Sequence, residues 1–108
     1  MENKFSFHLV PQARLDFYNI GKYIAEELQN PKAAYDFEDK FFEKVDVLTR
    51  FPLSGQLVDN KHNTDNDLRK IIVGSYIIFY KPMDKIKTIV IIRIIHGSRN
   101  IDKVLRKI

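Results

Sequence analysis

The chain has 108 residues, 44% of them hydrophobic, so it can form one domain with a core. None of the residues is cysteine, which excludes disulfides and thiolate metal sites. Residues 1–60 hold 7 Lys/Arg and 10 Asp/Glu, whereas residues 61–108 hold 11 Lys/Arg and 4 Asp/Glu. Positive charge in the C-terminal half indicates a face for phosphates or for an acidic partner, although a basic surface without function fits it equally.

The N-terminal segment MENKFSFHLV has an acidic second residue and lacks the apolar run of a signal peptide. No part of the sequence is apolar for long enough to span a bilayer. We therefore expect an unprocessed cytoplasmic protein that makes no contact with membranes. Phe5, Phe7 and Leu9 alternate with smaller or polar residues, which predicts a half-buried first strand that ends before Pro11.

Two amphipathic helices are predicted to follow. From Gln12 to Gln29, apolar residues recur at three- and four-residue steps and form one stripe of Ala13, Phe17, Ile20, Ile24 and Leu28. A second helix is predicted to begin at Asn30 and Pro31, because asparagine is a good N-cap and proline fits the first helical position. Its stripe consists of Ala34, Phe37, Phe41, Val45 and Leu48. Because the connection is short, the two helices should form an antiparallel hairpin.

The other faces of these helices carry charged residues, namely Asp16, Lys22, Glu26, Glu27, Asp36, Asp39, Lys40 and Glu43. We interpret them as solvated surface charge, which makes Asp16 and Glu26 poor catalytic candidates. The Phe51–Gly55 stretch FPLSG is predicted to end the second helix, and the polar segment from there to Asp67 is predicted to be a loop. His62 within it is predicted to be an ordinary surface histidine.

Three further strands are predicted at Leu68–Val73, Tyr76–Lys81 and Ile86–His96, joined by turns at Gly74-Ser75 and at residues 82–85. The order β-α-α-β-β-β predicts a single small α+β domain over residues 1–108. This domain should consist of an N-terminal strand, a two-helix antiparallel hairpin and a three-stranded antiparallel meander. It should have two layers, with the helices packed on one face of the sheet.

The last strand is apolar at both alternating sets of positions, so it should be central in the sheet. Strict alternation places Arg93 on the same side as Ile91 and Ile95. Because two helices cover only one face of such a sheet, the other face should be exposed or kept for a partner.

Basic residues near the ends of these strands are candidates for an anion site. Arg69, Arg93 and Arg99 can converge if their strands are neighbours, and arginine, which is always protonated, can only act electrostatically. His96 is the residue of this region that can exchange protons at neutral pH. Separate solvated arginines and a structural histidine at a strand end are the alternative. No metal site and no cofactor are expected.

Four segments, taken in order, resemble the RelE/ParE superfamily of type II toxin–antitoxin toxins: PQARLDFYNIGKYIAEEL, NPKAAYDFEDKFFEKVDVLTRFPLSG, LRKIIVGSYIIFYK and IIRIIHGSRN. The similarity is to the ParE branch in particular. It rests on the order of four motifs: Pro-x-Ala-x-x-Asp, Phe-Pro-x-x-Gly, Leu-Arg followed by Tyr and Phe-Tyr, and Arg-x-x-His-Gly-x-Arg. The resemblance covers nearly the whole chain. It implies a helical hairpin on a curved antiparallel sheet and a bacterial toxin encoded together with a cognate antitoxin.

The resemblance also implies a choice between two targets. Ribonuclease members of the superfamily cut mRNA on the ribosome, and here Arg69 and Arg93 match their cationic positions while His96 is a candidate acid or base. The sequence departs from that pattern, because no tyrosine or glutamate follows Tyr80 to supply a second proton-transfer group. Tyr80 itself is predicted to serve packing. ParE-type members instead poison DNA gyrase and lack the catalytic set.

Residues after His96 are predicted to form a short basic tail that binds a partner or nucleic acid, through Arg99, Lys103, Arg106 and Lys107. Because this tail adds little apolar surface beyond Ile101, Val104 and Leu105, we expect its removal from Asn100 onward to affect toxicity more than folding. The favoured hypothesis is a gyrase poison neutralised by a cognate antitoxin. An mRNA endonuclease and a degenerate toxin that only binds its antitoxin are the alternatives, so whether the protein is an enzyme stays open, as does its oligomeric state.

Overall fold

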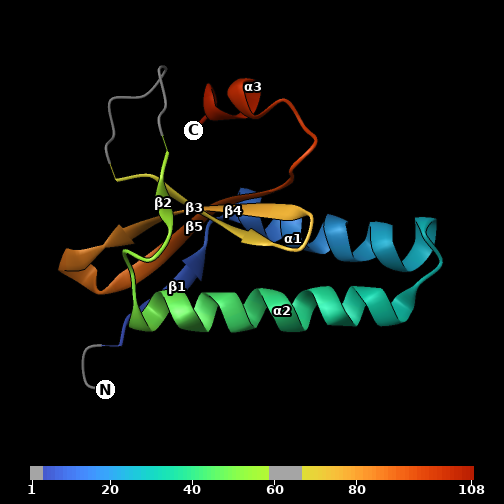
Figure 1. Cartoon of the computed structure of the whole chain (residues 1–108), viewed down its shortest axis with the longest axis horizontal. Coiled ribbons are helices and arrows are strands. Elements are labelled where there is room, and N and C mark those ends of the chain that lie inside the picture. The colour runs from blue at the N-terminus through green and yellow to red at the C-terminus, as the bar shows by residue number, and fades with distance from the viewer. Residues whose placement is uncertain (1–3, 59–66) are drawn as a thin grey trace.

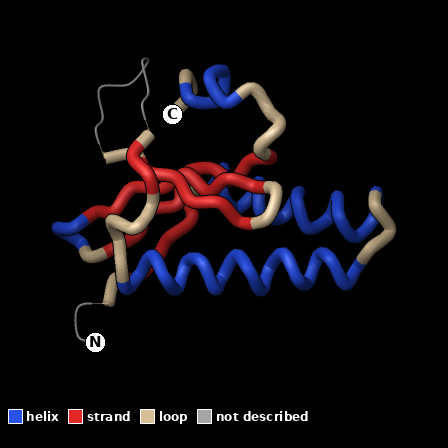
Figure 2. Tube along the Cα trace, viewed as in Figure 1, coloured by secondary structure: helices blue, strands red, loops and turns tan. Residues whose placement is uncertain are grey.

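A computed structural model describes residues 4–58 and 67–108. A five-stranded sheet has a helical hairpin on one face and a short C-terminal helix on the other (Figures 1 and 2). The strands are β1 (Ser6–Leu9), β2 (Gln56–Leu57), β3 (Arg69–Val73), β4 (Tyr76–Met83) and β5 (Thr88–His96). The helices are α1 (Pro11–Lys22), η1 (Tyr23–Glu27), α2 (Pro31–Arg50), η2 (Asp84–Ile86) and α3 (Ile101–Leu105). The histidine predicted to lie on the surface, His62, is outside the described residues.

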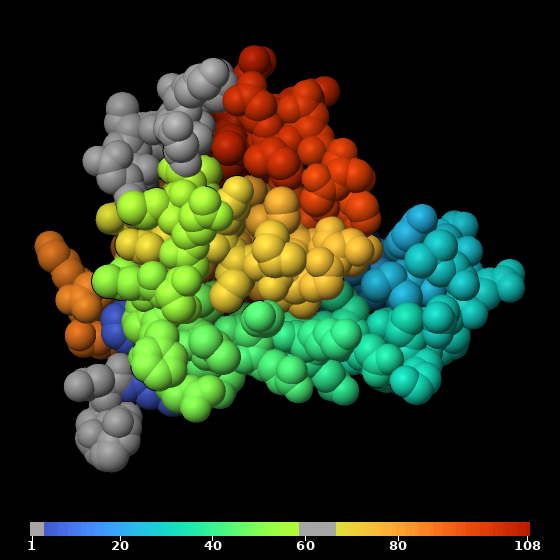
Figure 3. Space-filling view, in the orientation of Figure 1, coloured from blue at the N-terminus to red at the C-terminus, as the bar shows by residue number. Residues whose placement is uncertain are grey.

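The helical hairpin forms as predicted, with one difference in its first helix. The predicted single helix to Gln29 is divided, because α1 ends at Lys22 and the chain widens into the π-helical turn η1. Asn30 caps α2 by accepting a hydrogen bond from the Ala33 N–H at 3.1 Å. The tip of the hairpin, made of η1 and the start of α2, projects beyond the sheet (Figure 3).

The α+β architecture is confirmed, and two details of the sheet differ from the prediction. The meander β3-β4-β5 is antiparallel, and Val73 pairs with Tyr76 across a two-residue turn in which Gly74 has a φ of +59°. Strand β1, however, pairs with β5 in parallel, so the sheet is mixed. The predicted loop after α2 also contains the short strand β2, which pairs with β3. Strand β5 lies between β1 and β4 and is therefore central, as predicted.

A bulge in β5 changes which side chains share a face. Phe79 pairs with Arg93 but Tyr80 pairs with Ile91, so Ile92 is one extra residue. The prediction that Arg93 lies on the side of both Ile91 and Ile95 is wrong for this reason. Ile91 packs toward the helical hairpin, whereas Ile95 packs on the opposite face.

The sheet has a hydrophobic cluster on each face. The larger one lies under the helical hairpin and includes Phe37, Phe41, Val45, Leu48, Ile78, Tyr80, Ile89, Ile91 and Ile94. The smaller one consists of Leu68, Phe79, Ile95, Val104 and Leu105. The last two belong to α3, so the chain itself covers part of the second face with apolar residues of the tail. Of the helices that the structure describes, none is long and apolar enough to cross a membrane.

Candidate functional site

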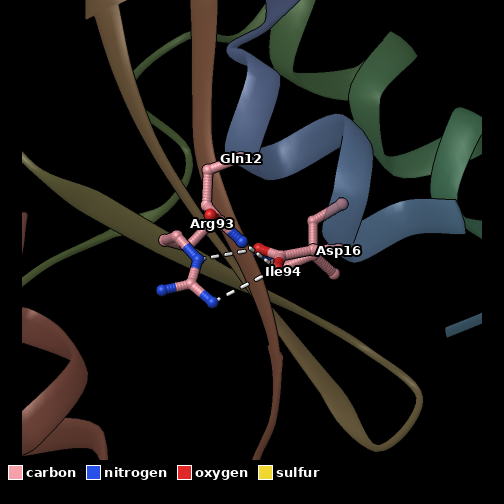
Figure 4. A network of polar contacts seen from close by, with 4 residues as sticks. All are labelled: Gln12, Asp16, Arg93 and Ile94. Atoms are coloured by element: carbon pink, nitrogen blue, oxygen red, sulfur yellow. Dashed lines mark hydrogen bonds and ion pairs between the residues drawn. The ribbon is translucent and has the colours of Figure 1, made fainter. Parts of the chain in front are cut away.

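Asp16 on α1 meets Arg93 on β5 where β1 ends. The pairing of β1 with β5 stops at Leu9 and Ile91, which leaves the following part of β5 without a strand on that edge. The Asp16 carboxylate takes the place of a strand by accepting the backbone N–H of Ile94 at 3.0 Å. It also accepts two hydrogen bonds from the Arg93 guanidinium, at 2.8 and 3.2 Å, as Figure 4 shows.

The prediction that Asp16 is solvated surface charge is wrong. Its side chain is 9% exposed and that of Arg93 is 16% exposed. Gln12, one helical turn earlier, donates a further hydrogen bond to the same carboxylate at 3.0 Å. A sequence signal for this position existed, since Asp16 follows the buried Ala13 by three residues and so lies beside the apolar stripe of the helix.

Arg69 lies on the face of the sheet opposite to Arg93 and binds backbone carbonyls. It pairs with Tyr80, which belongs to the cluster under the hairpin, whereas Arg93 pairs with Phe79 of the opposite cluster. The Arg69 guanidinium donates to the carbonyls of Leu53 and Gly55, at 3.2 and 2.8 Å. Arg69 therefore fixes the segment after α2, and the predicted convergence of Arg69 with Arg93 is not observed.

Tyr80 is fully buried, in agreement with its predicted packing role. Its hydroxyl accepts the Gly55 N–H at 2.8 Å and donates to the Pro52 carbonyl at 2.9 Å. Burial raises the pKa of the Tyr80 phenol, against the opposing effects of the Gly55 hydrogen bond and of Arg69. These contacts account for the glycine of the Phe-Pro-x-x-Gly motif, because Gly55 lies against the tyrosine ring.

His96 is exposed at the end of β5. Its Nδ1 accepts the Ser98 N–H at 3.0 Å and lies 2.7 Å from the Ser98 hydroxyl. The neutral imidazole therefore carries its proton on Nε2. The ring packs edge-on against Tyr76, its partner across the strands, with 5.2 Å between the ring centroids. Burial, and to a lesser extent Tyr23, raise the pKa of the Tyr76 phenol.

A groove of about 800 Å³ joins these residues to the helical hairpin. Tyr76, His96 and Arg99 line one side of it, while Tyr23 and Leu28 line the other. Sequence reasoning missed Tyr76 as a neighbour of His96. The pairing of the two residues depends on the register between β4 and β5, and the bulge in β5 shifts that register by one position.

A second cavity, of about 380 Å³, lies between β5 and α3. We call it the basic pocket; it is lined by Arg93, Arg99, Asn100, Lys103, Val104 and Lys107. Four of the predicted site residues are thus brought together there. Arg106 is not among them and instead forms an ion pair of 3.6 Å with Asp102. Within residues 4–58 and 67–108, no group of three His, Asp or Glu side chains is placed to hold a metal ion.

Solved structures of toxins have the same fold. The chain is similar to the chromosomal ParDE TA system from P. aeruginosa, with 17% identity, a TM-score of 0.67 and coverage of 89% of this chain and 99% of that one. It is similar to the archaeal RelE-RelB complex from Pyrococcus horikoshii, with 20% identity, a TM-score of 0.61 and coverage of 89% and 98%. A mutant E. coli RelE toxin in the free state gives 14% identity, a TM-score of 0.60 and coverage of 96% and 95%.

The architecture is therefore that of the RelE/ParE toxins. The family model for the ParE toxin of the type II toxin-antitoxin system parDE matches residues 8–101. This match spans most of the chain, and the protein belongs to the ParE toxin family. No curated protein sequence matches it.

Proposed function

We propose that this chain inhibits bacterial growth by poisoning DNA gyrase and that a cognate antitoxin neutralises it. The observation that carries the proposal is the separation of the residues that ribonuclease chemistry would require. Cleavage of RNA needs a base, an acid and cations around a single phosphate. Arg69 and Arg93 lie on opposite faces of the sheet, and each guanidinium is engaged within the protein.

The electrostatic state of Arg93 supports the same proposal. A guanidinium that stabilises a phosphorane needs its charge free for the substrate. The carboxylate of Asp16 neutralises Arg93 and holds it with two hydrogen bonds. Releasing the guanidinium would leave the Asp16 charge largely buried without a partner, which is unfavourable. Arg93 is therefore better suited to a fixed structural position than to catalysis.

We also propose that the groove beside the helical hairpin binds the antitoxin. The structures similar to this chain include the archaeal RelE-RelB complex and the intact E. coli RelBE toxin-antitoxin complex. The groove has an apolar rim, since Tyr23 and Leu28 are 51% and 56% exposed, and basic Arg99 lies at its other side. A segment with apolar and acidic side chains that orders on binding has complementary chemistry.

The deciding experiment is a supercoiling assay in which the purified toxin is titrated against gyrase and relaxed plasmid. Inhibition with accumulation of a cleaved gyrase–DNA complex is expected, and the antitoxin should reverse it. A translation reaction run in parallel should show intact mRNA. Supercoiling unchanged at large toxin excess, together with mRNA cleavage, would refute the proposal. If neither activity appears while the antitoxin still binds, the chain is a degenerate toxin.

One observation favours the ribonuclease alternative, with a set of residues different from the predicted one. His96, Tyr76 and Arg99 line the same groove and include two groups that can transfer protons. If mRNA is cut, His96→Ala should reduce the rate by about 10²- to 10⁴-fold, the range for a general acid or base. Tyr76→Phe should reduce it as well, whereas Arg69→Gln should act through stability.

A further inference from the structure

Two side chains of the basic pocket have hydrogen-bond donors that no described residue accepts. Arg93 binds Asp16 through Nε and Nη2, and its other terminal nitrogen points away from Asp16 in Figure 4. Asn100 caps α3 with its side-chain oxygen, which accepts the Lys103 N–H at 3.1 Å. The amide NH₂ group of Asn100 is then a further donor at the wall of the pocket. Both groups can bind an oxyanion without giving up their structural contacts.

Apart from Arg93, the basic side chains that line this pocket have no acidic partner among the described residues. Within the described parts of the chain, Arg99, Lys103 and Lys107 form no ion pair, whereas Arg106 on the same helix is paired with Asp102. Three like charges in one concave space raise the local positive potential and attract anions. Since Arg93 is offset by Asp16, the described residues that line the pocket carry an excess of three positive charges.

The scaffold of the pocket is rigid on both sides. Val104 and Leu105 are buried and hold α3 against the sheet, so Arg99, Lys103 and Lys107 project from an anchored segment. On the other side, the Asp16 contact fixes Arg93. An anchored backbone keeps these exposed basic side chains close to one another and to Arg93, which favours a defined site over diffuse attraction.

We propose that the basic pocket binds a backbone phosphate of DNA, so that the toxin contacts the DNA as well as the enzyme in the poisoned complex. The choice of DNA rests on the proposed function. A lone carboxylate or a lone phosphate carries one negative charge and would leave most of the excess uncompensated. A DNA strand presents a phosphate every 3.4 Å along its axis, so neighbouring phosphates satisfy the remaining lysines.

The experiment measures binding of the purified toxin to a fluorescein-labelled duplex of about 20 base pairs by anisotropy, from about 50 to 200 mM salt. Lys103→Gln and Lys107→Gln should each weaken binding by about threefold to tenfold at low salt and reduce the slope of log affinity against log salt by about 0.9. Arg106→Gln is the matched control, because it removes the same charge from the same segment but lies outside the pocket. It should change affinity by less than about twofold.

Equal losses for Arg106→Gln and Lys103→Gln would refute the pocket and indicate diffuse attraction. Tighter binding of a poly-glutamate peptide or of single-stranded RNA than of the duplex would refute the choice of ligand. Thermal melts of each variant exclude unfolding as the cause. Gyrase assays separate the two proposals: a toxin that traps gyrase but does not bind the duplex contradicts only the pocket. A toxin that binds the duplex but leaves gyrase active contradicts only the target.

Discussion

Asp16 and Arg93, 77 positions apart in the sequence, form an ion pair of 2.8 Å that closes the open edge of β5. The same carboxylate accepts the Ile94 N–H, so one side chain satisfies both a guanidinium and an unpaired backbone donor. This contact joins α1 to the central strand of the sheet.

Asp16→Ala should therefore be strongly destabilising. The substitution leaves the Arg93 charge and the Ile94 N–H without their partner in a nearly buried place, and losing one member of such a pair costs about 3–5 kcal/mol. Urea denaturation measures this change in the free energy of unfolding. Asp39→Ala, on the exposed face of α2, is the control and should change stability by less than about 0.5 kcal/mol. If Asp16→Ala lowered the free energy of unfolding by no more than the control does, the Asp16 contact would contribute nothing to stability.

Gly55→Ala should destabilise the protein because there is no space for a β-carbon. A β-carbon built at Gly55 would lie 2.6 Å from Cε1 of Tyr80 and 2.8 Å from the Lys70 carbonyl oxygen. Forcing such an overlap costs about 1–3 kcal/mol. Gly21→Ala is the matched control, since the nearest atom there is a Glu38 carboxylate oxygen at 3.7 Å. Because alanine favours the helix, that variant should be neutral or up to about 1 kcal/mol more stable in thermal unfolding.

Stability should fall at alkaline pH, and Tyr80 should contribute to the fall. Its pKa is raised by burial, so the unfolded chain ionises this phenol first as the pH rises above about 10. The stabilisation is complete below that pH and is lost as the pH rises toward the folded-state pKa. Tyr80→Phe should show a weaker alkaline dependence. At neutral pH it should be less stable by about 1–3 kcal/mol, because the buried Gly55 N–H loses its acceptor. Chemical denaturation at pH 7 and at about pH 10.5 measures both effects.

Leu105→Ala should show that α3 belongs to the folded core. Leu105 is 7% exposed and belongs to the cluster on the second face with Phe79 and Ile95. Truncating a buried leucine costs about 2–5 kcal/mol, and we expect the lower part of this range because α3 is short. Leu53→Ala, at a leucine that is 66% exposed, should have little effect. A stability for Leu105→Ala equal to that of Leu53→Ala would support the expectation that removing the tail affects toxicity more than folding.

Tyr23→Ser should weaken binding of the antitoxin by about tenfold or more, because exposed aromatic side chains that become buried on binding often dominate the affinity of an interface. Isothermal titration with the antitoxin encoded beside the toxin measures the loss. Tyr35→Ser is the matched control: Tyr35 is 68% exposed on α2 but does not line the groove. A larger loss with Tyr35→Ser would move the antitoxin site to the outer face of the hairpin.

The sequence by itself predicted the parts of this protein that depend on local periodicity and backbone chemistry. The apolar stripes gave the helical hairpin, Asn30 and Pro31 gave the start of α2, and Gly74-Ser75 gave the turn between β3 and β4. The doubly apolar pattern of β5 gave its central position. Each of these signals is contained within a few neighbouring residues, where propensity and spacing act.

Only the tertiary structure decided which distant residues meet. One extra residue in β5 reverses the faces of the side chains that follow, and no local pattern marks Ile92 as that residue. Asp16 is charged like its exposed neighbours, and its burial becomes favourable only because β1 ends early and Arg93 and the Ile94 N–H need an acceptor there. In the same way, the C-terminal segment is a helix of five residues whose two buried side chains gain stability only from contact with Phe79 and Ile95. Such contacts depend on long-range packing, which the order of residues along the chain does not reveal.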